Sequence, residues 1–535
     1  MPEARRTGAN GPRDGNGAPA SVRRTIEQAL TKSRMKLTTE RVGFYLCCVL
    51  SAAPLLFAHY PPMVDLPQHA AQIATLNNLS RPDFAYKSLF TLEWARPYLG
   101  GYLVIWALSQ VVSVLTAVKI SIALTVITIP MTAARLRAHF NADPRWDWLL
   151  LTIGYGFAFQ WGLVNFFVGA PIVLLFLASA FRYADAPSAR SGWWLALFAY
   201  LLLTVHLLIA AFGCGLACLY ILSGRGTWKA RLVAALPFVS PIPAVLAYLA
   251  WVISSTRQAN EPGPWGLSIF RPVQLMTSAL GLPITVANIA VAALVFALPF
   301  LLGARLTRER PRLVIFGAYL AWMMLGPNYF LGNYFTYQRF SLFCVPLFLI
   351  VLTDPVPRPA LSSALKLAQG LVVALPLTLV VVACFLFAGF DQESRGYREI
   401  AKAMKPGKRV LGLMINNASA AFDQPMYLHY ASWYQAEQRG VADFSFAQFG
   451  LLVSYRPGAD VPIPRGFEWF PQTFDWQRHQ GWLFDYFIVR SAEDVSRFVF
   501  RTADRPVRLA ARSGVWWLYE PDAGPRGPVA GATPR

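Results

Sequence analysis

The chain has 535 residues, of which 55% are hydrophobic and only 14% charged, and its mean hydropathy is +0.41. A soluble protein carries about 25% charged residues, so this composition excludes an ordinary soluble protein. The formal net charge of +20 would suggest nucleic-acid binding in a soluble chain. Most basic residues here flank apolar segments, and no nucleic-acid motif is present. Membrane topology and contacts with anionic membrane lipids therefore explain the charge.

The first 40 residues are polar and basic, and we predict that 1–40 is a disordered cytoplasmic tail. The apolar segment that follows, 41–58, begins too far from the N-terminus for a signal peptide and lacks a small-residue cleavage site. We therefore predict an uncleaved first membrane span. Because the basic tail stays in the cytoplasm, this span runs from the inside to the outside.

Residues 59–78 (HYPPMVDLPQHAAQIATLNN) interrupt the apolar pattern directly after this span. Four of their polar residues are spaced i, i+3, i+4 and i+7, so a helix would carry all of them on one face. A carboxylate and an imidazole at the mouth of a membrane bundle lose hydration, which favours a functional role. We predict that the aspartate and the histidine are catalytic and that the glutamines bind substrate. The four residues are Asp65, His69, Gln68 and Gln72.

A structural alternative competes with this prediction. Pro67 favours the first turn of a helix, and Asp65 would cap this helix if its side-chain oxygen accepted the N–H of Gln68. His69 would then be an interfacial side chain with one hydrogen-bonded nitrogen.

Two apolar segments follow, 98–113 and 115–134, and the predicted topology depends on whether both span the membrane. If only the second one spans, the basic clusters of the later loops all fall inside, as the positive-inside rule requires. We therefore predict that 98–113 is a juxtamembrane helix in the outer interface. Lys119 would lie near the outer end of the next span, able to snorkel to the surface. The clusters are Arg135/Arg137/Arg145, Arg182/Arg190, Arg225/Lys229/Arg231, Arg305/Arg308/Arg310/Arg312 and Arg358/Lys366.

Nine more apolar segments predict further spans, several of them shorter than the usual ~20 residues. With the first two they make about eleven, and this odd number places everything after residue 387 outside. The sequence thus predicts an α-helical polytopic membrane domain over 41–388, with a first outer loop at 59–114. The nine segments are 146–161, 166–181, 193–205, 207–222, 232–253, 284–302, 313–326, 340–352 and 367–387.

From residue 389 the pattern changes to that of a small α/β domain, which we predict over 389–521 outside the membrane. The Gly/Pro-rich residues 522–535 predict a flexible tail. The predicted elements of the domain are strands at 408–415 and 485–489, a helix at 427–439, and a hairpin from 507–511 and 515–519.

Further polar residues fall on the predicted outer face, and we expect them to bind substrate. Arg339 opens an apolar segment where orientation requires no positive charge, and its planar guanidinium matches phosphate oxygens. The alternative is an arginine that snorkels to the interface. For His206 the alternative is a buried neutral imidazole bonded to a backbone carbonyl. The full set is Lys87, Glu93, Arg96, Asn165, His206, Arg271, Tyr337, Gln338 and Arg339.

Three lone histidines and all six cysteines are predicted to have no part in the chemistry. His139, His429 and His479 are expected to be structural or solvated. The cysteines lie inside apolar segments, which excludes a disulfide framework or a zinc site in a loop. They are Cys47, Cys48, Cys214, Cys218, Cys344 and Cys384.

Several short motifs together resemble the GT-C superfamily of membrane glycosyltransferases, which includes protein O-mannosyltransferases and the aminoarabinose transferases of bacterial lipid A. They are VDLPQH (64–69), the segment 98–137 ending in RLR, GLVNFFVG (162–169) and YQRF (337–340), together with the C-terminal outer domain. The resemblance implies a polyprenyl-phosphate-linked sugar donor and transfer on the outer face. It also implies that Asp65 is the general base and Arg339 a ligand of the donor phosphate.

One departure from many members of the superfamily concerns metal binding. A single acidic residue, not an adjacent acidic pair, follows the first span. Hard divalent cations prefer several oxygen ligands, so we predict no metal site and no cofactor. Glu93 is the candidate for a second carboxylate if a divalent metal does bind.

We therefore predict an inverting hexosyl- or pentosyltransferase in the bacterial inner membrane, with the N-terminus cytoplasmic and the C-terminal domain periplasmic. The acceptor would be a glycan, a lipid or a protein, and nucleic acid is not a partner. A transporter or lipid flippase is one alternative, but its ionisable residues would lie deep in several spans, whereas the charges here cluster at span ends. A non-catalytic membrane scaffold with a binding domain is another.

Overall fold

The computed structural model describes residues 39–94, 96–255, 265–330, 333–354, 363–459 and 468–522. The chain divides into two units, 1–47 and 48–535. The described residues of the first unit belong to the start of an apolar helix, Thr39–Leu56. The predicted tails at 1–40 and 522–535 lie almost wholly outside the described residues.

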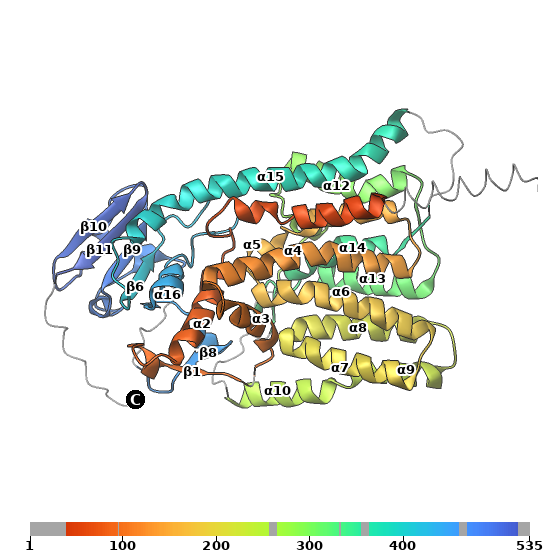
Figure 1. The fold of residues 1–535 in the computed structure, drawn as a ribbon, viewed down its shortest axis with the longest axis horizontal. Helices are drawn as coiled ribbons and strands as arrows, with labels where there is room; N and C mark the ends of the chain where they lie inside the picture. Colours follow the sequence, from red (N-terminus) through yellow and green to blue (C-terminus); the bar gives the residue numbers. More distant parts are fainter. Residues whose placement is uncertain are drawn as a thin grey trace, which may run out of the picture. The chain divides into compact units, whose positions relative to one another are not determined.

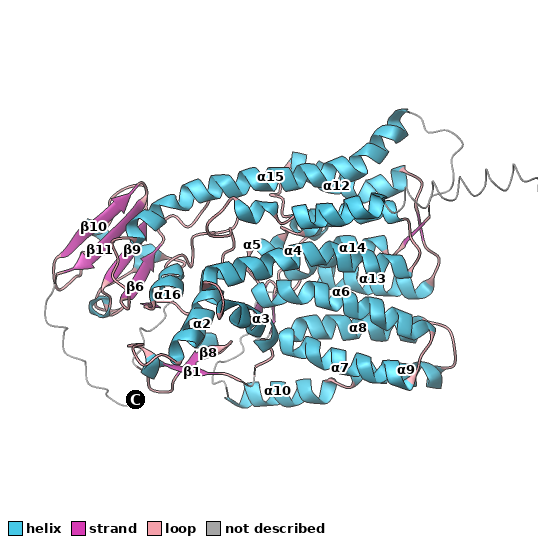
Figure 2. Ribbon diagram, in the orientation of Figure 1, coloured by secondary structure: helices cyan, strands magenta, loops and turns pink. Residues whose placement is uncertain are grey.

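Helices dominate the second unit up to Ala401, and most of them run side by side in a bundle (Figures 1 and 2). α6 is apolar on all sides, as expected of a helix enclosed by others, and 78% of its apolar window is buried, against 44% for α4. The helices, including 3-10 helices (η), are η1 (Ala53–Leu56), α2 (Leu66–Leu79), η2 (Lys87–Leu89), α3 (Leu99–Ser109), α4 (Val114–His139), η3 (Pro144–Ile153), α5 (Phe157–Gln160), α6 (Val164–Asp185), α7 (Ala189–Val205), α8 (Leu207–Ser223), α9 (Trp228–Val239), α10 (Ile242–Ser255), α11 (Arg271–Leu280), α12 (Val286–Leu301), α13 (Arg310–Leu325), η4 (Gln338–Phe343), α14 (Cys344–Leu349) and α15 (Ser363–Ala401). Three short strand pairs also belong to this unit: β1 (Phe90–Leu92) with β8 (Val453–Tyr455), β2 (Arg305–Leu306) with β5 (Leu352–Thr353), and β3 (Tyr329–Phe330) with β4 (Asn333–Tyr334).

Among the described residues, four helices are long and apolar enough to cross a membrane: Thr39–Leu56, α4, α6 and most of α15. The bent pair of α9 and α10, which meet at 43°, makes a fifth if it counts as one span. The predicted number of about eleven is therefore not confirmed. Each of the other predicted spans forms either a helix of 17 residues or fewer, such as α7 and α8, or two shorter helices that follow one another. Residues 144–160 divide into η3 and α5, and 338–349 into η4 and α14.

The first outer loop contains the helix expected at 98–113. α3 has 11 residues and is therefore about 16 Å long, too short to cross a bilayer. Ser113 then caps α4 by accepting the N–H of Thr116 at 3.2 Å. This agrees with the prediction that only the second of the two segments spans.

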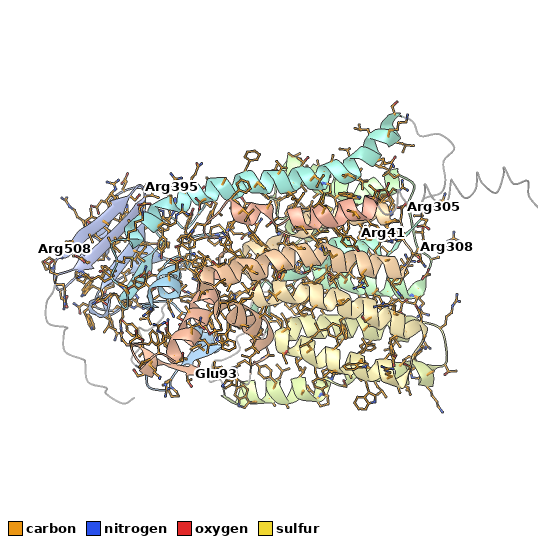
Figure 3. All side chains as sticks on the ribbon, in the orientation of Figure 1. Arg41, Glu93, Arg305, Arg308, Arg395 and Arg508 are labelled. Atoms are coloured by element: carbon orange, nitrogen blue, oxygen red, sulfur yellow. The ribbon has the colours of Figure 1, made fainter. Side chains whose placement is uncertain are left out.

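Charged residues mark two opposite ends of the second unit. Arg305 and Arg308, in the connection between α12 and α13, lie at the end away from the sheet, whereas Arg395 and Arg508 lie at the sheet end (Figure 3). The predicted domain boundary at 388/389 falls inside α15, which has 39 residues. A single glycine, Gly389, does not end this helix, because a glycine in a helix interior costs only about 1 kcal/mol.

The C-terminal segment forms a five-stranded mixed sheet with the strand order β10-β11-β9-β6-β7. β6 pairs in parallel with β7 and β9, while β11 pairs antiparallel with β9 and β10. The two strands, the hairpin and the helix that the sequence predicts are present, but the helix, α16, is shorter than expected. The elements are β6 (Arg409–Leu413), α16 (Ser432–Gln438), β7 (Val441–Ala442), η5 (Phe446–Phe449), η6 (Pro471–Thr473), η7 (Gly481–Leu483), β9 (Tyr486–Arg490), α17 (Ser496–Val499), β10 (Val507–Ser513) and β11 (Trp516–Pro521).

The C-terminal segment and residues 59–114, the predicted first outer loop, are joined at two places. α2 packs against α16 (Figure 1), and β1 pairs antiparallel with β8. The predicted outer loop and the predicted outer domain therefore form one continuous packed region, and α2 lies at its centre.

Candidate active site

Asp65 stands at the start of α2, but its side chain does not cap the helix. It occupies the N-cap position with no side-chain cap hydrogen bond, and its side chain is 17% exposed. Its main-chain N–H donates to the carbonyl of Trp161 at 3.1 Å, and that of Val64 donates to Gln160 at 3.0 Å. The capping alternative is therefore wrong, and the helix start leaves the carboxylate available for other contacts.

The partner of this carboxylate comes from the C-terminal segment. His429 Nε2 lies 3.4 Å from Asp65 Oδ1. The imidazole stacks on Phe444 with ring centroids 4.9 Å apart, and Phe446 meets it edge-on at 5.8 Å. Nδ1 of His429 is buried and has no hydrogen-bond partner among the described residues. The ring is thus held by aromatic contacts, with Nε2 presented to Asp65.

His429 was expected from the sequence to be structural or solvated, so its place beside Asp65 was not predicted. Its residue type was the only local signal, because the neighbouring residues (Leu428, Tyr430) belong to no recognisable motif. Only the packing of α16 against α2 brings His429 to Asp65.

His69 has partners on two sides. Its Nδ1 lies 2.5 Å from Tyr102 Oη, and its ring also bonds the backbone of Gly162. Tyr102 in turn bonds the side chain of Asn165. Burial lowers the pKa of His69 to about 4, although Asp65 acts in the opposite direction. The imidazole is therefore neutral near neutral pH and is held on two sides, so it helps to position α2. The catalytic role expected of His69 stays a prediction.

A left-handed glycine brings the loop before α6 against Asp65. Gly162 has φ +74°, a conformation that favours glycine over residues with a Cβ. A Cβ at this position would lie 2.7 Å from the backbone nitrogen of Asp65 and 2.9 Å from that of Leu66. The glycine of the GLVNFFVG segment is therefore needed both for its backbone conformation and for this close approach.

Gln68 and Gln72 hold the outer loop to the C-terminal segment. Gln68 Nε2 donates to Ser432 Oγ at 2.7 Å and to the Phe444 carbonyl at 2.9 Å, while its Oε1 accepts the N–H of Phe446 at 3.0 Å. Gln72 Oε1 accepts the N–H of Val453 at 2.8 Å. Both side chains are 1% exposed. These bonds give both side chains a structural role, and the substrate binding expected of them stays a prediction.

The other charged residues of the outer loop lie around β1. Glu93 accepts a hydrogen bond from Ser454 Oγ, and its second oxygen lies 3.8 Å from Arg96 Nε. Lys87 is exposed. These contacts tie Glu93 to the β1–β8 pair. Among the described residues, no group of three or more His, Cys, Asp or Glu side chains is arranged to hold a metal ion.

Arg339 is buried, so the snorkelling alternative is wrong. Its side chain is 5% exposed and lies over the ring of Phe166 at 5.7 Å. Nε donates to the carbonyl of Phe335 at 3.2 Å, and the guanidinium also donates to the carbonyl of Tyr334. Its charge acts electrostatically on Asp65 and on His206. The structure therefore places this cation within electrostatic range of the Asp65 carboxylate.

His206 and Asn165 also belong to this buried region. His206 Nδ1 accepts the N–H of Leu208 at 3.1 Å and caps α8, so it bonds an N–H group and not the carbonyl that the alternative predicted. Asn165 Oδ1 is buried without a hydrogen-bond partner among the described residues, and it presses against Gly101.

Three residues predicted to bind substrate brace loops. Arg271 is 1% exposed and donates to four backbone carbonyls, at 2.8–3.3 Å, and its guanidinium lies 4.0 Å from the ring of Tyr337. Tyr337 donates to Gln274 Oε1 at 3.2 Å, and Gln338 donates to Asn328 Oδ1 at 2.7 Å. These contacts brace the connections before α11 and η4. Nε of Arg271 and Oε1 of Gln338 are buried without a hydrogen-bond partner among the described residues, and the substrate binding expected of the three residues stays a prediction.

A cavity of about 300 Å³ lies next to the segment that contacts Asp65, and its lining is mostly apolar with polar residues that include Asp423 and Gln424. η3, α5, α11, α12 and α15 line it, together with residues 421–424 of the C-terminal segment. Gln160, whose carbonyl bonds the N–H of Val64, forms part of its wall. Val382 and Leu386 on α15 also line the cavity and are 43% and 37% exposed, so it borders the apolar outer surface of that helix.

Comparison with known proteins gives likenesses of fold only. No family model and no curated protein matches the sequence. The structure is similar to that of the arabinofuranosyltransferase AftD from Mycobacteria, with a TM-score of 0.49 and 14% identity over 90% of this chain. The chain spans only 40% of the length of AftD. It is also similar to ArnT from Cupriavidus metallidurans in the apo state, with a TM-score of 0.48 and 11% identity over 90% of this chain and 98% of ArnT.

Proposed function

We propose that this chain is a membrane glycosyltransferase of the GT-C type that transfers a sugar from a polyprenyl phosphate to an acceptor hydroxyl or amine, with Asp65 as general base. One observation carries the proposal. Asp65 begins a buried helix without capping it, and its carboxylate instead meets the imidazole of His429 at 3.4 Å. A partly exposed carboxylate held by a second residue from a distant segment is a typical general-base arrangement.

In the proposed reaction, the acceptor O–H or N–H donates its proton to Asp65 as the acceptor atom attacks the anomeric carbon. The bond between this carbon and the phosphate oxygen breaks, and the phosphate leaves with the electron pair. A single displacement of this kind inverts the anomeric centre. With its Nε2 near Oδ1, His429 would orient the carboxylate so that Oδ2 faces the acceptor.

The donor would be held by charge and by apolar contact. Arg339, within electrostatic range of Asp65, would stabilise the charge that develops on the leaving phosphate. The mostly apolar cavity next to Gln160 suits the first isoprene units of a lipid donor. In this proposal the C-terminal segment lies on the periplasmic side, and the acceptor is a glycan, a lipid or a protein.

The test is the variant Asp65→Asn, which keeps the size and polarity of the side chain but cannot take a proton. Sugar transfer from a panel of polyprenyl-phosphate-linked hexoses and pentoses would be measured in nanodiscs. We expect the rate to fall by about 10²–10⁴-fold, the usual contribution of a general base. Melting temperature and binding of the polyprenyl phosphate should stay close to wild type.

Asp83→Asn is the matched control, because Asp83 lies in the same outer loop with a side chain that is 60% exposed. This variant should keep full activity. An active Asp65→Asn variant would refute the proposed base. A wild-type protein that transfers none of the tested sugars and binds no polyprenyl phosphate would contradict the proposed enzyme class.

A further inference from the structure

A second cavity lies away from the candidate active site. It is a groove of about 730 Å³ between α7, α9 and the C-terminal end of α6, a volume within the range of about 300–1,000 Å³ that is typical of ligand sites. A Cβ on Gly192 would lie 3.4 Å from Pro237 and 3.5 Å from Tyr183, so these three residues form its floor. None of the residues that line the groove belongs to the Asp65 cluster.

The long walls of the groove are apolar and unusually exposed. Val233 and Leu236 on α9 are 65% and 58% exposed, and Trp193 on α7 is 79% exposed. Contiguous apolar surface of this kind is unfavourable in water and marks contact with lipid or with another protein. Because α7 and α9 are themselves apolar helices, an aliphatic chain is the natural occupant of these walls.

One end of the groove differs from the rest. Ser188, which caps α7 by accepting the N–H of Ser191 at 3.3 Å, lines this end together with Lys229. Of the described residues that line the groove, Lys229 alone has a formal charge, and no described residue forms an ion pair with it. Both α7 and α9 begin here, so their dipoles add positive potential. Trp228, which is 56% exposed, lies beside Lys229, and tryptophan is enriched at the level of lipid headgroups.

We infer that this groove binds one anionic phospholipid, with an acyl chain along Val233 and Leu236 and the headgroup phosphate at Lys229. The apolar walls fit the aliphatic chain of any phospholipid. The positive end, which no carboxylate neutralises within the groove lining, selects a lipid with net negative charge over a zwitterionic one. The inference is independent of the proposed transferase reaction, because it uses none of its residues.

The test is a competition between palmitoyl-oleoyl phosphatidylglycerol and palmitoyl-oleoyl phosphatidylcholine for the detergent-purified full chain, read by native mass spectrometry. We expect one preferentially retained phosphatidylglycerol on the wild-type protein. Lys229→Ala should reduce the preference for this lipid about fivefold, the factor that corresponds to one lysine at an anionic membrane surface. Ala196→Phe, which fills the groove, should reduce the retention of both lipids.

Two control variants separate the groove from general surface effects. Lys366→Ala removes an exposed lysine outside the groove, and Leu197→Phe enlarges an exposed side chain next to Ala196 that does not line it. Both should bind lipid as the wild type does. The inference is overturned if the wild type shows no preference between the lipids, if Lys366→Ala lowers the preference as much as Lys229→Ala, or if Ala196→Phe retains both lipids normally.

Discussion

At the scale of single residues, Asp65 and His429 are held in place by two different kinds of contact. Asp65 is fixed through its backbone by the carbonyl of Trp161, whereas His429 is fixed through its ring by Phe444. Neither contact uses the atoms that face each other, so the carboxylate oxygen and Nε2 remain free to respond to a substrate. By contrast, the side chains of Gln68 and Arg271 donate hydrogen bonds to other groups of the protein.

A first prediction follows for His429. If it orients the Asp65 carboxylate, His429→Gln should lower kcat by up to about 100-fold, because a misplacement of a catalytic group by ~1 Å can cost about 10²-fold in rate. KM for the donor should change little, and the pH profile of kcat should shift, since the neighbour of the base has changed. The matched variant is His479→Gln, whose Nδ1 accepts the N–H of Asp475 at 2.9 Å in the same segment. It should alter stability but not kcat; equal effects on kcat would exclude the positioning role.

A second prediction concerns the pH dependence of stability. The pKa of His69 is lowered by burial to about 4, below its ordinary value of about 6.5. Between these values the unfolded chain binds the proton and the folded chain does not, so folding stability falls as the pH decreases from 6.5 towards 4. At pH 4 the free energy of unfolding has decreased by about 3 kcal/mol. Melting temperatures of wild type and His69→Gln at pH 7 and pH 5 provide the measurement. The melting temperature of the variant should fall less than that of the wild type between pH 7 and pH 5. An equal fall in both proteins would contradict the lowered pKa of His69.

At the scale of elements, α2 is positioned from both sides. The loop that ends in Gly162 contacts its first turn, and α16 packs along its length. Thr75 Oγ1 accepts a hydrogen bond from Gln435 Nε2 at 2.9 Å, and the two bonds from Gln68 secure the N-terminal half. The catalytic carboxylate proposed here therefore stands on a helix that cannot shift without breaking contacts with both the bundle and the sheet.

The third prediction tests the loop against α2. Gly162→Ala places a Cβ 2.7 Å from the backbone nitrogen of Asp65 and should displace α2, so both melting temperature and sugar transfer should decline sharply. Gly458→Ala is a close control, because Gly458 has the same φ of +74° and no atom within 4 Å of an added Cβ. Its free energy of unfolding should fall by only about 1–2 kcal/mol, which is the cost of a left-handed backbone conformation at a residue with a Cβ. Equal losses in the two variants would mean that the close approach to Asp65 has no influence.

At the scale of the whole molecule, the second unit separates two kinds of surface. The helix α2, at whose start Asp65 stands, and the sheet lie toward one end (Figure 1), and the loop with Arg305 and Arg308 lies at the other (Figure 3). Exposed apolar side chains on α7, α9 and α15, such as Trp194, Leu232 and Phe385, cover the helices between the two ends. This distribution is that of a membrane bundle with a polar region at each end.

The fourth prediction tests the orientation. In a cysteine-free background, Arg395→Cys at the sheet end should react with a membrane-impermeant maleimide in intact cells. Arg308→Cys at the other end should react only after permeabilisation, because basic loops stay inside. Both arginines are exposed, so access to solvent is matched. The reverse labelling pattern would place the proposed active site in the cytoplasm and would contradict a periplasmic reaction.

The sequence by itself determined what depends on local pattern. The spacing of the polar residues and Pro67 indicated a helix within 59–78, short apolar runs indicated β6 and β9, and the positive-inside rule distinguished α3 from α4. Asp65 stood out because a carboxylate beside an apolar span is costly to desolvate. Such signals depend only on the order of residues along the chain, and the chain carries them whether or not it is folded.

Only the tertiary structure decided which polar groups remain available and which are already used. His429 is far from Asp65 in the sequence, and α16 carries no motif that marks its approach to α2. Conversely, Gln68, Gln72 and Arg271 resemble substrate ligands in the sequence, but in the structure they bond backbone groups of distant segments. The number of spans was also undetermined, because packing decides whether an apolar segment stays one helix or divides, as at η3 and α5. Long-range packing and hydrogen bonding set these outcomes, and no local pattern encodes them.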